Sequence, residues 1–287
     1  MTELITPEAR RLDSEIIYRF PKLSRSFAAD LIKLGKVSVN GEAEFRPGYR
    51  LKDDDQVNID FDPTQLDSIP ELELPVIYED DNCVVINKPA GILVHSKGGF
   101  NPEATVATWL RSRLKGMEGE RAGIVHRLDR ATSGVMICAK NVETAKSLQK
   151  QFADRKVKKT YLALIKGKLA NPEAVIDMPI ERNPKAPATF RVGVNGKPSL
   201  TKYRTIESTQ KYSLLEMKPE TGRTHQLRVH LAKLGHPIIG DELYGGEEAN
   251  RLYLHALTLE ITIPMGQRRV FRARQPVDFR KKLNSRS

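Results

Sequence analysis

The stretch that decides the fold runs from His126 to Gly134 and reads HRLDRATSG. A single carboxylate, Asp129, stands there between two arginines and leads into a short polar turn that ends at glycine. Apolar runs flank it, GIV at residues 123–125 and VMICA at residues 135–139, and both predict buried strands. The pattern predicts that Asp129 lies on a sharp connection that presents it to a cleft, although a surface loop with ordinary ion pairs has the same composition.

This stretch resembles the signature of the RluA-type pseudouridine synthases, which reads HRLD, two variable residues and then TSG. Arg130 and Ala131 fill the variable positions. The resemblance implies an essential aspartate at Asp129, nucleophilic or assisting elimination. It also implies that His126 contacts the RNA and that Arg127 fills the place that a flipped uridine leaves.

Three further stretches resemble the other motifs of this family: KPAG at residues 88–91, KTYLA at residues 159–163 and TGRTHQLRVH at residues 221–230. By resemblance, Tyr161 stacks on the uracil and serves in removing the proton from carbon five, and Arg223 is the cationic partner of Asp129. The other residues that we assign to RNA or substrate binding in these motifs are Lys88, Thr224, His225 and Leu227. Leucine stands at position 227 where the family often has isoleucine, a change that keeps a packing role.

The charge of the chain favours a polyanionic partner. Its 287 residues hold 47 Lys and Arg against 36 Asp and Glu, a net charge of +11, and their number allows one large domain and one small one. The opening residues lack the apolar core of a signal peptide, and no apolar run approaches membrane-spanning length. We therefore expect a cytoplasmic protein that does not bind a membrane.

The cysteines and histidines predict neither a disulfide nor a metal site. Cys83 and Cys138 each lie in an apolar run, as expected for reduced thiols in the core. The six histidines lack the spacing of metal ligands. The chain also has no phosphate-binding glycine loop and no nucleotide fingerprint, so we expect no cofactor.

The first sixty or so residues predict two helices followed by a small sheet. Apolar residues recur at helical spacing before Gly35, and VSVNG at residues 37–41 predicts a strand and a tight turn. Between Arg10 and Lys52 there are ten Lys and Arg against five Asp and Glu, which suits phosphate contacts. This part resembles the S4-like RNA-binding domain, and we assign residues 1–62 to it.

An acidic segment follows, with eleven Asp and Glu and no Lys or Arg between Asp53 and Asn87. Prolines punctuate it, and we place a linker at residues 63–75 and the catalytic domain at residues 76–287. The charge of the linker would keep it off the RNA and let the small domain swing. A solvated acidic loop without that role is equally consistent.

The resemblance implies an α+β fold, with a mixed, largely antiparallel sheet and a central cleft in the catalytic domain. The residue pattern agrees: residues 142–152 and the region from Leu227 to Leu234 have helical spacing, while residues 160–165 and 252–263 alternate like strands. Residues 170–198 hold five prolines and predict short strands and loops that could contact the substrate. The basic tail, residues 266–287, predicts a rim for RNA or an ordinary solvated end.

The chemistry of uridine isomerisation suits these residues. The bond from ribose to the ring nitrogen breaks, the uracil turns, and carbon five joins the sugar and loses a proton, so no group is transferred. Glycosidases normally pair two carboxylates, whereas this signature offers one carboxylate with arginines, which fits a leaving group that is kept and reused. The residues leave open whether Asp129 attacks the sugar or the base.

Two other classes of function remain open at this point, a non-catalytic RNA-binding protein and a nucleoside or glycosidic hydrolase that releases free base. If the chain is a synthase, its partner is structured RNA. Large-subunit ribosomal RNA is favoured, since a second RNA-binding element suits a large target, and transfer RNA is the alternative. We expect a monomer.

Overall fold

The structure, a computed structural model, describes residues 10–20, 23, 25–62, 71–96, 103–117 and 121–285, without the side chain of residue 26. It divides into two compact units. One comprises Met1–Leu72, His95–Thr108 and Glu118–Arg121, and the other comprises Glu73–Val94, Trp109–Met117 and Ala122–Ser287. The linker expected at 63–75 lies largely outside the described residues, and the domain boundaries stay a prediction.

The small unit has two helices and a three-stranded antiparallel sheet in the order β2-β1-β3, as the sequence predicted. Its elements are α1 (Leu12–Arg19), α2 (Arg25–Lys33), β1 (Val37–Val39), β2 (Glu42–Ala43) and β3 (Val57–Ile59). Leu12 and Ile16 on α1 pack with Ile32 on α2 against Val37. The turn after β1 takes positive φ at Asn40 (54°) and Gly41 (86°), which is typical of a tight hairpin.

Asp13 fixes the two helices of this unit to each other. Its carboxylate is buried and accepts hydrogen bonds from Arg11 Nε at 3.0 Å and Nη2 at 2.9 Å, and from Arg25 Nε at 3.2 Å. The Arg11 hydrogen bond lowers the pKa of Asp13, followed by that from Arg25, while burial alone would raise it. The buried charge is therefore compensated by two arginines.

The large unit is built on a nine-stranded sheet in the order β4-β5-β6-β13-β7-β12-β11-β8, with β14 paired to β13. Its strands are β4 (Val76–Glu79), β5 (Cys83–Lys88), β6 (Ser133–Ala139), β7 (Lys158–Lys166), β8 (Glu173–Asp177), β11 (Leu200–Ser208), β12 (Tyr212–Pro219), β13 (Leu254–Thr262) and β14 (Arg268–Arg272). A separate hairpin is formed by β9 (Ile180–Arg182) and β10 (Phe190–Val192). Among the described strands only β6 and β13 pair in parallel, so the prediction of a mixed, largely antiparallel sheet is confirmed.

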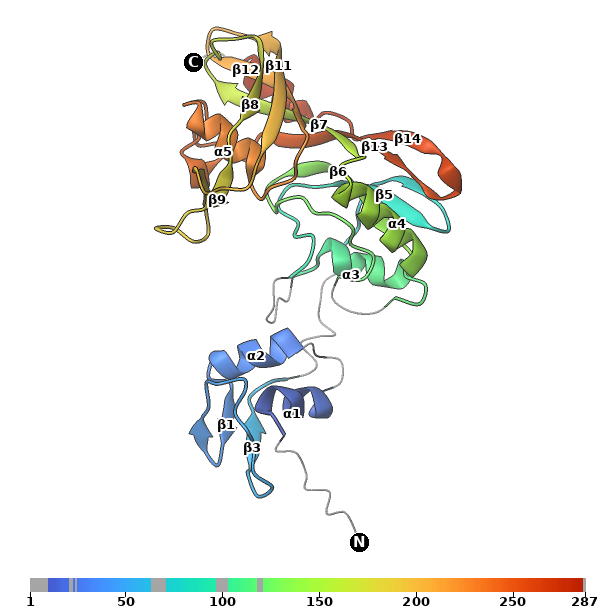
Figure 1. Ribbon diagram of the computed structural model, residues 1–287, viewed down its shortest axis with the longest axis vertical. Helices are drawn as coiled ribbons and strands as arrows, with labels where there is room; N and C mark the ends of the chain where they lie inside the picture. Colours follow the sequence, from blue (N-terminus) through green and yellow to red (C-terminus); the bar gives the residue numbers. More distant parts are fainter. Residues whose placement is uncertain are drawn as a thin grey trace. The chain divides into compact units, whose positions relative to one another are not determined.

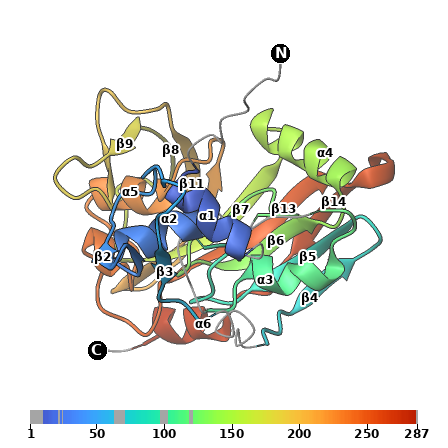
Figure 2. The same cartoon turned by 90° about the horizontal axis from the view of Figure 1, so that it is seen from below.

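Two helices pack on the strands that flank the HRLDRATSG turn and the cleft. α4 (Val142–Ala153) packs on β6 and β13, and α5 (Gln226–Lys233) packs on β12 and β10. Figure 2 shows α4 and α5 on opposite sides of the large unit with β7 and β13 running between them. Both helices were predicted, and Asn141 caps α4 by accepting a hydrogen bond from Thr144 N at 2.9 Å.

The tail contains a helix that the sequence analysis did not predict. This tail helix is α6 (Val277–Leu283), labelled in Figure 2. Earlier in the chain, the short helix α3 (Val106–Leu110), labelled in Figure 1, is followed by a 3₁₀ turn at Arg111–Arg113. Phe279 on α6 is fully buried and packs against Tyr253 with ring centroids 5.1 Å apart. No helix among the described residues is long and apolar enough to cross a membrane.

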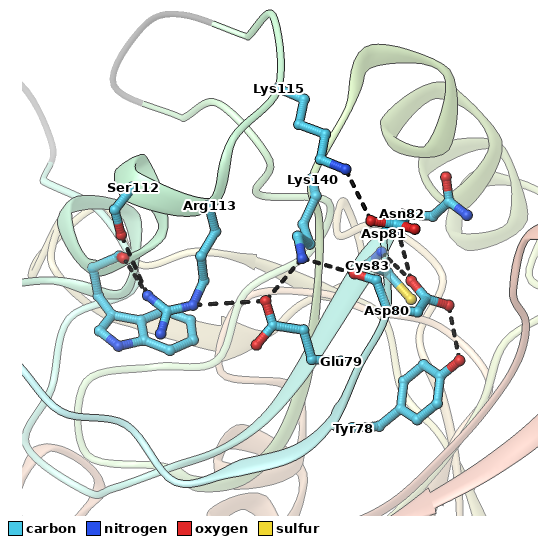
Figure 3. A network of polar contacts seen from close by, with 11 residues as sticks. Tyr78, Glu79, Asp80, Asp81, Asn82, Cys83, Ser112, Arg113, Lys115 and Lys140 are labelled. Carbon is cyan, nitrogen blue, oxygen red and sulfur yellow. Dashed lines mark hydrogen bonds and ion pairs between the residues drawn. The ribbon is translucent and has the colours of Figure 1, made fainter.

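A polar network braces the β4–β5 corner of the sheet (Figure 3). Lys140 Nζ donates to Glu79 Oε1 at 2.8 Å and to the Asp80 carbonyl at 2.7 Å. The Asp80 carboxylate accepts from the backbone N–H of Asn82 and of Cys83, which closes the turn. This corner holds the end of β6 against β5.

The prediction of two buried, unpaired thiols is confirmed. Cys83 on β5 and Cys138 on β6 are both fully buried and free. Burial raises the pKa of each thiol to about 12, so neither is reactive at neutral pH.

Candidate active site

A cleft of about 490 Å³ opens above the sheet of the large unit, and Asp129 lies in its wall. The side chains come from the HRLDRATSG turn, the end of α4, β7, the end of β12 and the start of α5. The predicted residues that line it are His126, Arg127, Asp129, Tyr161, Arg223, Thr224, His225 and Leu227. The structure thus brings together eight of the nine residues that the sequence analysis named, all except Lys88.

The predicted contact of Lys88 with RNA or substrate is wrong, because Lys88 is buried beneath the turn and does not line the cleft. Its side chain is 0% exposed, and Nζ donates to the carbonyl oxygens of Pro89 (2.8 Å), Ile92 (2.9 Å) and Arg130 (3.2 Å). Burial lowers its pKa to about 7, while the charge of Asp129 opposes this. Three carbonyl acceptors match the three N–H groups of an ammonium, so the contacts select the charged form. Lys88 therefore braces the backbone beside Asp129 instead of binding RNA.

His126 lies at the cleft wall, but its ring is committed to the fold. Nε2 accepts a hydrogen bond from Ile137 N at 3.1 Å, and the ring stacks on Phe152 with centroids 4.5 Å apart. Burial lowers the pKa of His126 to about 3. The ring is therefore neutral with its proton on Nδ1, and it positions the turn more than it contacts a substrate.

The cation on Asp129 is Arg228 on α5, and not Arg223 as the sequence analysis predicted. Arg228 Nη1 lies 3.4 Å from Asp129 Oδ2, while Nε and Nη2 donate to the two oxygens of Asp241 at 2.8 and 2.7 Å. The Asp241 side chain is 0% exposed and that of Arg228 is 9% exposed. Burial alone would lower the pKa of Arg228, but Asp241 and Asp129 together raise it. The arrangement holds a fixed positive charge beside Asp129.

Arg223 instead contacts a backbone carbonyl, and among the described residues it forms no ion pair with Asp129. Its Nε donates to the carbonyl oxygen of Pro198 at 3.2 Å, so the guanidinium lies toward the residues that precede β11. Arg223, Gly222 and Thr224 line both the cleft and a second groove beside it. Arg223 is therefore at the border of the site.

His225 also approaches Asp129, at the start of α5. Its Nε2 lies 3.8 Å from Asp129 Oδ2, and its Nδ1 is 2.8 Å from the hydroxyl of Tyr244. That hydroxyl also accepts a hydrogen bond from Phe190 N at 3.0 Å, so Tyr244 links His225 to the β9–β10 hairpin. His225 therefore lies between the Tyr244 hydroxyl and the Asp129 carboxylate. His225 holds this place with a left-handed backbone, φ 57°, which is strained for a non-glycine residue.

Tyr161 and Arg127 lie where a nucleotide base could meet them. Tyr161 is half-buried on β7, and burial, followed by the charge of Asp129, raises the pKa of its phenol. Arg127 is exposed and makes no side-chain hydrogen bond or ion pair with any residue that the structure describes. Both placements suit contact with an inserted base.

The remaining lining gives the cleft a positive charge. Its basic residues are Arg127, Arg155, Lys159, Arg223 and Arg228, and its carboxylates are Asp129 and Glu220. Thr224 is exposed at the rim and Leu227 is buried in the wall. Within the described ranges no group of three or more His, Cys, Asp or Glu side chains could hold a metal.

Three residues of the site were missed by the sequence analysis: Arg228 lies in the quoted motif at residues 221–230 without a role, and Asp241 and Tyr244 follow that motif in the sequence. Arg228 carried a usable signal. It stands between Leu227 and Val229 on a helix whose first six residues are all buried, so its charge required a buried carboxylate. For Tyr244, whose hydroxyl contacts the β9–β10 hairpin and His225, the sequence holds no such signal.

Comparison with known proteins agrees with this site. The family described as RNA pseudouridylate synthase matches residues 82–233, and the S4 domain matches residues 10–57. The solved structure of Human RNA Pseudouridylate Synthase Domain Containing 1 superimposes with a TM-score of 0.61 at 33% identity, covering 71% of this chain and 84% of that one.

Two bacterial relatives extend the likeness to most of the chain. Ribosomal large subunit pseudouridine synthase D of Borreliella burgdorferi is 41% identical over 241 residues, 79% of this chain and 74% of that protein. An uncharacterized RNA pseudouridine synthase of Aquifex aeolicus is 40% identical over 246 residues, 83% of this chain and 78% of that protein. With the signature at residues 126–134 lining the cleft, the chain belongs to the RluA-type RNA pseudouridine synthases, isomerases that act on RNA.

Proposed function

We propose that Asp129 is the residue that acts on the target uridine, after the uridine has left the RNA helix and entered the cleft. The observation that carries this is the charge arrangement: Arg228, fixed by the buried Asp241, reaches Asp129 at 3.4 Å and places a cation beside the carboxylate. A base inside a stacked helix is out of reach of this carboxylate, so the uridine must flip.

The other cleft residues receive roles that fit their surroundings. Arg127, exposed at the rim, would fill the vacated stack. Tyr161 would stack on the uracil, and its raised pKa keeps the phenol protonated, which fits stacking better than unaided uptake of the proton from carbon five. His225, with Nε2 3.8 Å from Asp129, would help to orient the carboxylate.

We further propose large-subunit ribosomal RNA as the target, with transfer RNA as the alternative. Two features support ribosomal RNA. The relative from Borreliella burgdorferi bears the name of a ribosomal large subunit enzyme, and the chain adds an S4 domain to its catalytic part. A second RNA-binding element raises affinity most on a large, structured RNA.

One experiment tests both proposals. Total RNA from cells with the gene, without it, and with Asp129→Asn is mapped for pseudouridine. We expect at least one large-subunit uridine to be modified only with the wild-type chain, because the amide keeps the shape of Asp129 but removes its charge and nucleophilicity.

The contrary results are distinct. A modified site that persists with Asp129→Asn, in protein that folds normally, would remove the role of Asp129. Modification confined to transfer RNA would keep that role and replace the target. Release of free uracil from purified RNA would assign the carboxylate to a hydrolase.

A further inference from the structure

A second groove of about 460 Å³ lies beside the catalytic cleft, and the proposed function does not use it. The β9–β10 hairpin and the residues after it form one side, and Gly222, Arg223 and Thr224 form the other. Because those three residues also line the catalytic cleft, the two sites meet at this loop. A ligand in the groove would therefore lie next to a ligand in the catalytic cleft.

The hairpin is held in a defined shape. Arg182 Nη1 donates to the Pro187 carbonyl at 2.8 Å across the loop, and Phe190 N donates to the Tyr244 hydroxyl at 3.0 Å. A side chain at Gly196 would come within 2.6 Å of the Ile180 backbone, so only glycine lets the chain close here. The groove therefore has a fixed wall on its hairpin side.

The groove carries an excess of positive charge. Glu181, the one carboxylate among its described lining residues, is bound by Arg191, whose Nη2 lies 2.7 Å from Oε1. Arg182, Lys197 and Arg223 line the groove as well, and none of them is paired with a carboxylate among the described residues. Three such cations around one groove suit a phosphate group.

The groove also has a flat surface of the kind that nucleic-acid bases stack on. Phe190 is half-buried, and the guanidinium of Arg182 lies over its ring at 5.5 Å from the centroid. Aromatic rings and guanidinium planes are the usual stacking partners of unpaired bases. Asn195 and Thr224 lie on the lining and offer hydrogen-bonding groups to a base edge.

We propose that this groove binds the nucleotide next to the flipped uridine in the RNA strand. Its phosphate lies between Arg182, Lys197 and Arg223, and its base packs against Phe190. The proposal rests on the proposed function, because it takes the flipped uridine in the neighbouring cleft as given. An acidic peptide would satisfy the cations but would leave the stacking surface unused.

The test measures RNA affinity by titration with the stem-loop around the mapped uridine. The variant Arg182→Gln/Lys197→Gln is compared with Lys185→Gln/Lys168→Gln, which removes the same charge from exposed positions outside the groove. Because both groove residues contact the same phosphate, the groove variant lowers the slope of log affinity against log salt by about 0.7 to 0.9. The control variant lowers it clearly less.

A modified RNA makes the test specific to one nucleotide. Replacing the phosphate next to the target uridine with an uncharged methylphosphonate weakens binding to the wild-type chain more than binding to the groove variant, which keeps only Arg223 of the three cations. Phe190→Leu, which keeps the backbone N–H, weakens binding of the intact stem-loop about fivefold or more, and not of a stem-loop that lacks the neighbouring base.

Equal slopes for the groove and control variants, or a methylphosphonate effect as large in the groove variant as in the wild type, would overturn the proposal. Failure of the proposed function gives a different result. In that case the wild-type chain forms no pseudouridine in the stem-loop, whatever the affinity series gives.

Discussion

At the scale of single residues, Arg228 divides its guanidinium between two carboxylates of opposite character. Asp241 is buried and binds it through two hydrogen bonds, while Asp129 is partly open to the cleft and receives only Nη1 at 3.4 Å. The buried pair keeps the cation in place, and the looser contact leaves Asp129 able to move toward a substrate.

This division predicts that stability and activity separate on mutation. Arg228→Met leaves Asp241 as an uncompensated buried carboxylate and should cost about 3 to 5 kcal/mol of unfolding free energy. Adding Asp241→Asn removes the buried charge and should restore most of that loss. Neither variant should isomerise uridine at an appreciable rate, since Asp129 has lost its cation. Urea unfolding and a pseudouridine assay measure the two effects.

Arg223→Met is the matched control for stability, because that side chain binds only a backbone carbonyl at the border of the site. Its unfolding free energy should stay within about 0.5 kcal/mol of the wild type. If Arg228→Met/Asp241→Asn were as unstable as Arg228→Met, or had near wild-type activity, the division of roles between Asp241 and Asp129 would be contradicted.

The lowered pKa of His126 in the cleft wall predicts a dependence of stability on pH. Its pKa is about 3 in the fold, against about 6.5 for an ordinary histidine, so only the unfolded chain takes up a proton between those values. Its contribution is complete above about pH 6.5 and is lost as the pH falls toward 3. Between pH 7.5 and pH 5 the free energy of unfolding should therefore fall by about 1 to 2 kcal/mol less in His126→Gln than in the wild type.

Urea unfolding at the two pH values measures this difference. His236→Gln, in the turn after α5, is the control and should follow the wild-type trend. An unchanged pH dependence in His126→Gln would show that the ring is protonated in the folded chain.

At the scale of elements, the approach of β6 to β13 depends on one glycine. Gly134 has φ 119°, and a Cβ there would lie 2.2 Å from the Ala256 carbonyl oxygen on the parallel neighbour. The HRLDRATSG turn ends at this contact, so the same glycine closes the sheet and anchors the turn that carries Asp129.

Gly134→Ala should therefore lower the free energy of unfolding far more than an alanine substitution at a glycine whose only constraint is its positive φ. Gly91, with φ 89° and no atom within 4 Å of a Cβ, is the control, and Gly91→Ala should cost about 1 to 2 kcal/mol. Gly134→Ala should cost at least about 2 kcal/mol more, or leave the protein insoluble, because backbone atoms must shift. If thermal or urea unfolding showed equal losses of stability for Gly134→Ala and Gly91→Ala, the backbone of β13 would be able to shift at little cost.

The elements also show how far the sequence could predict this molecule. α4 and α5 were predicted because their apolar residues repeat at helical spacing, and the cleft was predicted because its motifs resemble a family. The position of α6 was not predicted, since only Phe279 and Leu283 anchor a short basic segment. The choice of Arg228 over Arg223 depends on the direction of a side chain, which the spacing of two arginines in one motif does not encode.

At the scale of the whole molecule, two units with RNA-binding character share one chain. Most of the family match lies in the large unit, and the S4 match lies at residues 10–57, where basic residues outnumber acidic ones. If the small unit contributes affinity through phosphate contacts, its effect grows with the size of the RNA and shrinks with salt.

Removing residues 1–62 should therefore separate chemistry from recognition. The truncated chain should isomerise the short stem-loop within about threefold of the full chain, since the cleft residues all lie in the large unit. On the large RNA its kcat/KM should fall by about tenfold or more. The salt slope of that rate should also become shallower, by about 0.7 to 0.9 for each phosphate that the small unit neutralises in the full chain.

A full-length variant tests the same idea without truncation. Lys33, Arg50 and Lys52 are exposed basic residues of the small unit. Changing all three to Gln should lower kcat/KM on the large RNA and make its salt slope shallower, in both cases by less than the truncation does. Circular dichroism checks that the truncated chain is folded. If the folded truncated chain fails equally on both RNAs, the small unit takes part in forming the site; if it works equally on both, recognition lies in the large unit, where the second groove would then supply it.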